Sequence, residues 1–272
     1  MDAYRQFVCQ FEEALGAALP VPNLANFPRP PRAVDGAPVV LLFSPHPDDE
    51  VITGALPLRL QRELGARVVN IAVTLGSKAE RRAGRRRELE KACQLLGWEC
   101  EIHGWTELTP EAMAGNVQHP QNWQGSVVEI IERWQPRWIF YPHADDAHPT
   151  HMAVHLLVAQ AVRTAKMAQP AYLVQTEYWR PLARPNLLVE CAPDSLALLV
   201  AALCCHEGEI ARNPYHLTLP AWMADNVRRG AELVGGPGAA APTFRFGVLY
   251  RVEPELPPGW GSLIPAHSLA KN

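Results

Sequence analysis

The chain has 272 residues, of which 48% are hydrophobic and 19% are charged, and its formal net charge is -3. This composition is typical of a globular protein that is long enough to build one large core. The lack of a basic excess argues against a nucleic-acid partner, and no uninterrupted apolar run approaches the roughly 18 residues of a membrane span.

The predicted elements alternate between helices and strands. A weakly periodic amino-terminal helix (1–20), expected to lie on the main domain, precedes a Pro-rich connector. Strands are predicted near 39–43, 67–74, 99–103, 137–141, 171–178, 186–191 and 244–252, and helices near 50–64, 85–96, 126–134, 151–168, 194–205 and 221–234. Pro57 is expected to kink or restart the first of these later helices, and the tail after Pro254 is expected to be peripheral.

This alternation predicts an α/β fold with a Rossmann-like, doubly wound and mostly parallel sheet flanked by helices. We expect a single domain over 1–272. In it, 1–37 form the amino-terminal helix and connector, 38–210 form the core, and 211–272 complete the fold. The six cysteines show no C-x-x-C spacing, and the amino terminus lacks the apolar core of a signal peptide. We therefore expect reduced thiols and a cytoplasmic protein.

A dense polar cluster follows the first predicted strand. His46, Asp48, Asp49 and Glu50 come directly after a buried apolar run, where open α/β sheets place their ligand crevice. An imidazole and a carboxylate three residues apart can converge on one zinc ion, which would leave Asp48 free to act as a general base. The alternative interpretation is that the aspartates cap a helix and Glu50 complements its dipole.

A second cluster follows the strand predicted at 137–141. His148, His151 and His155 lie at i, i+3 and i+7, on one face of a helix that His148-Pro149 begins. At least one is expected to bind metal, and His155 fits a packing or supporting role better. Two histidines and one carboxylate leave coordination positions open, which is typical of a catalytic zinc site. Zinc-activated water, an Asp48 base and a histidine acid together predict hydrolysis of an amide.

Two motifs carry a family resemblance. Ser44-Pro45-His46-Pro47-Asp48-Asp49-Glu50, together with His148-Pro149-Thr150-His151, resembles the PIG-L/LmbE-like zinc-dependent N-acetylglucosamine deacetylases. Thr74-x-Gly76, the following helix from Arg85 to Gly97, and more loosely the segment from Ala202 to Glu209 are similar to later parts of that family. The resemblance covers about residues 38–210, and its first motif is highly specific.

The resemblance implies a role for each matching residue. Zn2+ would be held by His46, Asp49 and His151, with Asp48 as the base, His148 as oxyanion stabiliser and acid, and Arg85 as a substrate contact. The implied substrate is a small-molecule amino sugar, N-acetylglucosamine carried on inositol, malate, a lipid or an antibiotic aglycone. Members of the family form various assemblies, so a homo-oligomer is compatible with it.

This chain departs from the family at Thr150, where an aspartate usually orients the neighbouring histidine. We expect Asp145 or Asp146 to reach His148 instead, because threonine cannot supply the charge. The basic run at 81–87 either begins a solvated helix or lines an anionic substrate pocket. The segment 104–122, expected to be a surface loop, and the region after Ser195 are expected to decide specificity.

Three alternatives use the same residues. A metal-dependent amidase of the same fold could act on a non-sugar or another N-acyl substrate. An iron(II) oxygenase also uses two histidines and a carboxylate, but usually on an all-β fold. A carbohydrate-binding protein without catalysis would have no use for Asp48.

Overall fold

The computed structural model of the chain describes residues 1–27, 36–114, 122–254 and 263–264. One sheet runs through the molecule, in the order β3-β2-β1-β4-β5-β7-β6-β8. Its strands are β1 (Val39–Ser44), β2 (Arg67–Ala72), β3 (Glu99–Ile102), β4 (Trp138–Pro142), β5 (Tyr172–Thr176), β6 (Leu187–Glu190), β7 (Gly247–Glu253) and β8 (Leu263–Ile264). The first five are parallel, and β7 runs antiparallel to both β5 and β6.

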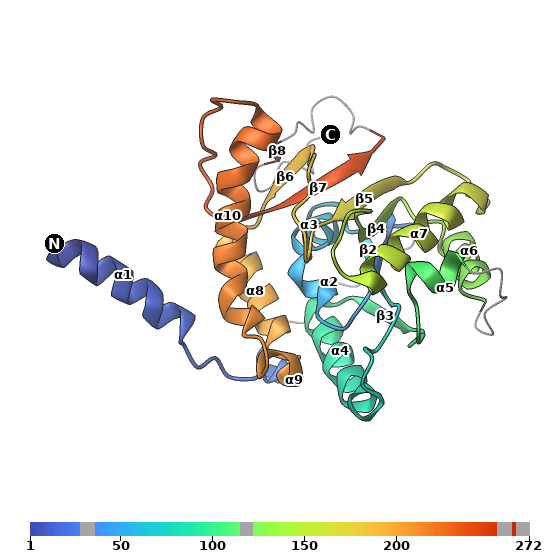
Figure 1. Cartoon of the computed structure of the whole chain (residues 1–272), viewed down its shortest axis with the longest axis horizontal. Helices are drawn as coiled ribbons and strands as arrows, with labels where there is room; N and C mark the ends of the chain where they lie inside the picture. The colour runs from blue at the N-terminus through green and yellow to red at the C-terminus, as the bar shows by residue number, and fades with distance from the viewer. Residues whose placement is uncertain (28–35, 115–121, 255–262, 265–272) are drawn as a thin grey trace.

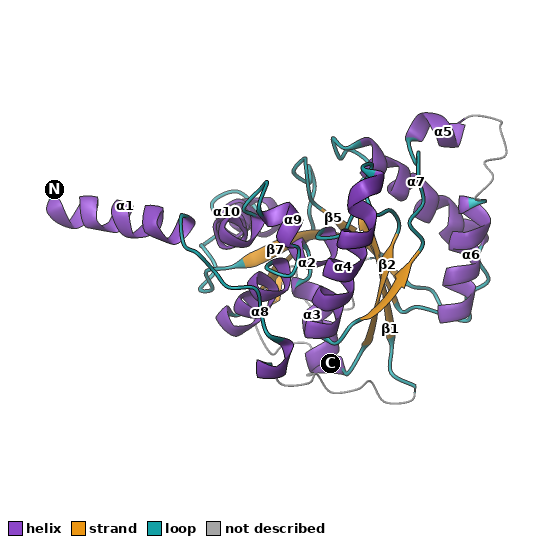
Figure 2. Ribbon diagram, turned by 90° about the horizontal axis from the view of Figure 1, so that it is seen from below, coloured by secondary structure: helices purple, strands orange, loops and turns teal. Residues whose placement is uncertain are grey.

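Helices cover both faces of the sheet (Figure 2). They are α1 (Asp2–Leu15), α2 (Asp49–Ile52), α3 (Ala55–Leu64), α4 (Arg82–Leu96), α5 (Pro110–Ala114), α6 (Trp123–Trp134), α7 (Pro149–Thr164), α8 (Pro193–Leu203), α9 (Glu207–Ile210) and α10 (Tyr215–Gly235), with short 3-10 turns η1 (Leu24–Asn26) and η2 (Ala79–Arg81). The predicted α/β fold with a mostly parallel sheet is confirmed.

The central strand β1 explains why the sheet is buried on both sides. Leu41 and Phe43 point into a core formed with α6 and α7, while Val40 and Leu42 point into a second core formed with α3, α4 and α8. All four side chains are inaccessible to solvent. A continuous apolar run is what a parallel strand covered on both faces requires.

Four predictions need correction. The helix α1 does not lie on the domain: it projects from the body and buries none of its residues (Figure 1). The helix α10 begins at Tyr215, six residues earlier than predicted, and contains Pro220. Part of the expected loop 104–122 forms α5, while 115–121 lie outside the described residues. The tail contributes β8, which pairs with β6.

Pro57 restarts the helix, as one of the two predicted outcomes required. It is the third residue of α3, where the backbone N–H of an ordinary residue has no partner within the helix. Gly65 ends α3 with φ 65°, a left-handed conformation that glycine adopts without strain. The six cysteines are all unpaired, and four of them are buried. Within the described residues, no helix has both the length and the apolar character to cross a membrane.

Candidate active site

The polar cluster after β1 forms a tight turn into α2. Asp48 has φ 110°, a strained value for a residue with a side chain. Its carboxylate makes no capping hydrogen bond to α2. The turn is held instead by its neighbours, because Asp49 accepts a hydrogen bond from the backbone N–H of His46 and Glu50 accepts one from that of Asp48. Helix capping therefore does not account for Asp48.

Three side chains converge on one point beside this turn. His46 Nδ1, His151 Nε2 and Asp49 Oδ2 lie 3.2 to 3.3 Å from one another. Ligand atoms in a tetrahedral zinc site with bonds of about 2.0–2.1 Å are about 3.3–3.4 Å apart. The three predicted ligands therefore already occupy three corners of such a tetrahedron, although they come from two segments about a hundred positions apart.

His148 lies next to this tripod of His46, Asp49 and His151. A nitrogen of its ring lies within 4.8 Å of those of His46 and His151. His148 is also the N-cap of α7, and its Nδ1 accepts a hydrogen bond from the backbone N–H of Thr150 at 3.2 Å. A neutral imidazole that accepts at Nδ1 carries its proton on Nε2. Burial lowers the pKa of His148 to about 4, so the ring is a neutral donor near pH 7.

We predicted that Asp145 or Asp146 reaches His148, and Asp146 reaches its backbone N–H, but neither carboxylate makes a described hydrogen bond to its ring. Asp146 is buried; one of its oxygens accepts from the backbone N–H of His148, and the other lies 3.6 Å from Nδ1 of His151. Its carboxylate therefore faces His151, in the arrangement that fixes the ring orientation of zinc-binding histidines in many proteins. Asp145 is exposed, and its backbone N–H donates to His143.

His155 lies outside the cluster, although it shares the helix face of His151. Its Nδ1 lies 2.9 Å from the carbonyl oxygen of Pro142, and its ring packs on Tyr141 with centroids 5.3 Å apart. The side chain thus helps to join α7 to β4. This agrees with the packing role favoured for it.

The charges of the turn are strongly perturbed. Burial, with the nearby charge of Asp49, raises the pKa of Asp48 well above its usual value. Burial would also raise the pKa of Asp49, but His151 and His46 lower it overall. Burial opposes protonation of His151, but Asp49 and Asp146 outweigh it and raise its pKa to about 9. Two adjacent aspartates therefore have opposite tendencies, as acid–base sites often require.

A buried pair behind the turn was missed by the sequence analysis. Nε2 of His206 lies 2.8 Å from Oε1 of Glu50, and neither side chain has solvent exposure. The other oxygen of Glu50 accepts from the backbone N–H of Asp48. Glu50 therefore links His206 to the strained turn and helps to hold its backbone in place. The signal was present, since His206 belongs to the segment that loosely resembles the family.

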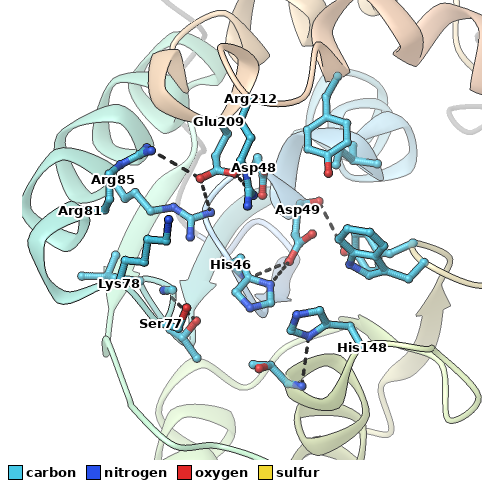
Figure 3. Close-up of a pocket in the computed structure, with 18 of the residues that line it drawn as sticks. His46, Asp48, Asp49, Ser77, Lys78, Arg81, Arg85, His148, Glu209 and Arg212 are labelled. Carbon is cyan, nitrogen blue, oxygen red and sulfur yellow. Dashed lines mark hydrogen bonds and ion pairs between the residues drawn. The ribbon is translucent and has the colours of Figure 1, made fainter.

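The cluster opens into a pocket of about 780 Å³. Figure 3 shows His46 and Asp48 near its centre, His148 on one side, and Arg81 and Arg85 on the other. The predicted substrate residue Arg85 lines this pocket and donates to the carbonyl oxygen of Pro47 at 3.0 Å. Further lining residues absent from the predictions include Lys78, Trp105, Tyr178, Trp179, Glu209, Arg212, Tyr215 and Trp222.

Fold and site together define an α/β protein with a two-histidine, one-carboxylate cluster at the carboxyl ends of parallel strands. Residues 41–162 match the model of the PIG-L family, described as GlcNAc-PI de-N-acetylase. The predicted resemblance to this family is thereby confirmed for the core of the chain.

A curated relative supports the same assignment. A 1D-myo-inositol 2-acetamido-2-deoxy-alpha-D-glucopyranoside deacetylase from Nocardia farcinica is 27% identical over 169 residues. The match spans 52% of this chain and 56% of the relative, which is only about half of the relative's length.

Solved structures share the fold at low sequence identity. The N,N'-diacetylchitobiose deacetylase from Pyrococcus horikoshii matches with a TM-score of 0.59 and 16% identity, covering 92% of both chains. GalB, the 4-carboxy-2-hydroxymuconate hydratase from Pseudomonas putida, matches with a TM-score of 0.61 and 15% identity, covering 81% of this chain and 98% of its own. One fold thus carries an amide hydrolase and a hydratase, so function must be argued from the site.

Proposed function

We propose that this protein is a zinc-dependent N-deacetylase that removes the acetyl group from a small molecule containing N-acetylglucosamine. The observation that carries the proposal is the tripod of His46, Asp49 and His151 beside a buried carboxylate, Asp48, that caps no helix. The PIG-L match and the curated deacetylase relative support the choice of reaction and of sugar.

The donor set fits zinc. The spacing of its three atoms suits a tetrahedral ion, and the two imidazoles with one carboxylate leave a position open for water or substrate. A zinc ion held there would acidify a water molecule and polarise the acyl carbonyl. The buried Asp146, 3.6 Å from the outer nitrogen of His151, fits the carboxylate that commonly supports such a ligand.

Asp48 is the proposed general base. Its burial and its proximity to Asp49 raise its pKa, which makes the carboxylate a better proton acceptor than an exposed aspartate. Because the backbone of Asp48 is fixed by Glu50, the carboxylate faces the pocket without a partner of its own among the described hydrogen bonds. It accepts the proton of the attacking water.

His148 is the proposed oxyanion donor. Since Nδ1 accepts from the N–H of Thr150, Nε2 carries a proton that it can donate to the oxygen of the tetrahedral intermediate. Thr150 thus contributes its backbone, and no charged side chain among the described residues makes a hydrogen bond to the ring. Because burial lowers the pKa of His148 to about 4, we assign the acid role expected for His148 to Asp48, and the leaving amine takes its proton from the protonated Asp48.

The reaction class distinguishes this proposal from its alternatives. An amidase for another N-acyl substrate would release a different acid, and an iron oxygenase would consume oxygen. A binding protein would release nothing. The solved hydratase of the same fold makes a direct assay of the products necessary.

The test is acetate release from a panel of N-acetylglucosaminides by the zinc-loaded protein. We expect release that is lost on chelation, restored by zinc, and lost in Asp48→Asn with zinc content unchanged. Asp194→Asn, an exposed aspartate on α8, is the matched control and should retain full activity. Stoichiometric zinc with no acetate from any glycoside would overturn the deacetylase proposal and leave a metal site of another reaction.

A further inference from the structure

A stripe of cations forms one wall of the pocket. Lys78, Arg81, Arg82 and Arg85 lie at i, i+3, i+4 and i+7 across η2 and the start of α4, and all four line the cavity. Arg82 and Arg85 are three positions apart in α4 and share one side of that helix, whereas Lys78 and Arg81 reach the cavity from the turn before it. Arg86 belongs to the same basic run but is exposed away from the cavity, 3.9 Å from Glu90. The run therefore divides into a pocket face and a solvent face.

The acids near this wall do not balance its charge. Arg81 and Arg85 both contact the carboxylate of Glu209, at 3.7 and 3.6 Å. Arg212, two residues beyond the end of α9, pairs with the same carboxylate at 2.6 Å. Glu88 adds a single longer contact of 3.9 Å to Arg81. Two carboxylates thus serve three arginines.

The remaining two cations have no described ion pair. Arg82 donates to the backbone carbonyl oxygens of Gly76 and Ser77, which carry no net charge. Lys78 is exposed and has no described hydrogen bond or ion pair. When Arg212 is counted with the wall, five cations thus face two paired carboxylates, in a protein whose net charge is -3.

The arginine heads are packed in place and yet incompletely bonded. A side-chain carbon on Gly208 would overlap the guanidinium of Arg81, and one on Gly76 would overlap that of Arg85. Nη2 of Arg81 and Nε of Arg85 are buried without a hydrogen-bond acceptor. Buried donors are normally satisfied, and an anionic oxygen is the acceptor that positively charged donors bind most strongly.

The other acids of the cavity cannot fill this role. Asp49 belongs to the histidine tripod, Asp48 interacts electrostatically only with the wall residue nearest the turn, Arg85, and Glu107 makes no described ion pair with the wall. Figure 3 shows Lys78 and Arg81 across the cavity from His148, with His46 and Asp48 between them. We call the side of the pocket with His46, Asp49 and His151 the metal end, after its proposed ligand. A molecule whose amide lies at the metal end can thus extend a second group to the cationic wall.

We propose that the substrate carries an anionic group, a phosphate or a carboxylate, on the substituent at the sugar's O1, and that Lys78, Arg81 and Arg82 bind it. This inference rests on the proposed deacetylase function for the orientation of the substrate. It narrows the substrate class to acidic conjugates of N-acetylglucosamine and assigns a subsite that neutral glycosides leave empty.

The test compares three ligands that differ only at the sugar's O1: N-acetylglucosamine 1-phosphate, the carboxymethyl glycoside and the methyl glycoside. Binding is measured calorimetrically to zinc-loaded full-length Asp48→Asn, so that turnover plays no part. We expect at least one anionic ligand to bind about tenfold more tightly than the neutral one, because charge-assisted hydrogen bonds dominate its contact. This advantage should shrink as salt is raised, and whichever anion binds more tightly identifies the group.

Variants of the wall locate the effect. Lys78→Met, which removes an exposed side chain without described partners, should lose most of the anionic advantage and leave binding of the methyl glycoside unchanged. Arg82→Lys keeps the charge and should retain part of it. Arg86→Met on the solvent face of α4 is the matched control and should retain all of it.

The outcomes separate the two proposals. Equal affinity for anionic and neutral ligands, or equal losses in Lys78→Met and Arg86→Met, would overturn the anionic subsite. Acetate release from the methyl glycoside would still uphold the deacetylase in that case. Tighter anion binding that depends on Lys78, with no acetate released by the wild-type protein from any ligand, would uphold the subsite and overturn the deacetylase.

Discussion

The metal end and the cationic wall of the pocket are built in opposite ways. At the metal end, His46, Asp49 and His151 contact one another, and the charge of each is compensated by its neighbours. Along the wall, Lys78 and Arg82 have no acidic partner among the described ion pairs. The proposed ligands at the metal end already lie at the spacing that a small cation requires, whereas the positive charge of the wall is compensated only when an anion binds.

This difference separates reaction from recognition. A compensated, buried cluster can be recognised from a short motif, because its members are close in sequence or lie at strand ends. An uncompensated wall is recognised only when the partners of each cation are counted in the folded chain. We therefore expect changes at the metal end to lower kcat or metal content, and changes at the wall to raise KM for anionic substrates.

The largest effect is expected at Asp48. Asp48→Asn should lower kcat by about 10²–10⁴-fold, because the variant cannot accept the proton of the attacking water. KM and zinc content should stay near wild type. Steady-state kinetics of Asp48→Asn and Lys78→Met, measured side by side, check this. Lys78→Met should show the reverse pattern, a raised KM for an anionic substrate with kcat preserved. A shared pattern in both variants would remove the distinction between the two ends.

The second-largest effect is expected at the buried pair of Glu50 and His206. Glu50→Gln leaves His206 without its carboxylate, and breaking a buried pair of this kind costs about 3–5 kcal/mol. Chemical denaturation should show the loss in free energy of unfolding. Glu90→Gln, which removes the exposed partner of Arg86 on α4, is the comparison; a loss as large there would show that Glu50 has no special role in holding the turn.

A smaller effect is expected at Asp146, which contacts the proposed ligand His151 from the side away from the metal. Asp146→Asn should weaken zinc binding by about 10–100-fold, because the amide no longer provides the negative charge behind His151. Competition with a chelator of known affinity measures it. Asp145→Asn, at the exposed neighbouring position, should bind zinc as the wild type does, and equal losses in both would contradict the support of His151 by Asp146.

The smallest effect is expected outside the pocket. His103, and then Arg133 and Trp134, hold the pKa of Glu101 at about 2, against the pull of burial. A carboxylate with a lowered folded pKa stabilises the protein above its unfolded value near 4.3 and loses that contribution as the pH falls toward 2. Glu101→Gln should therefore reduce stability by about 0.2–1 kcal/mol at pH 6.

The same variant should match the wild type more closely near pH 2, where the wild-type carboxyl is partly protonated. Denaturation curves at both pH values check this. A difference that grows on acidification would reverse the sign and contradict the ion-pair explanation. Activity at pH 6 should be unchanged, because Glu101 does not line the pocket. Variants at either end of the pocket should instead change kcat or KM.

The parallel half of the fold and the position of the proposed metal site could be predicted because they depend on local order. Apolar runs fix β1 and β4 as buried strands, and the polar residues after each run must then meet at one edge of a parallel sheet. The meeting of His46 and Asp49 with the histidines after β4 follows from that rule, whereas the choice of His151 among those histidines came from the family resemblance. Helix boundaries were less certain, since α10 begins before Pro220 rather than after it.

Only the tertiary structure decided the contacts between distant segments. Glu50 and His206 are 156 residues apart, and nothing local indicates that they meet. Whether Asp146 faces His148 or His151 depends on side-chain rotation at the start of α7, which a pattern of residue types does not encode. The charge surplus of the wall likewise depends on which acids α9 brings to α4. Residue order determines which strand end carries a group, whereas packing determines its partner.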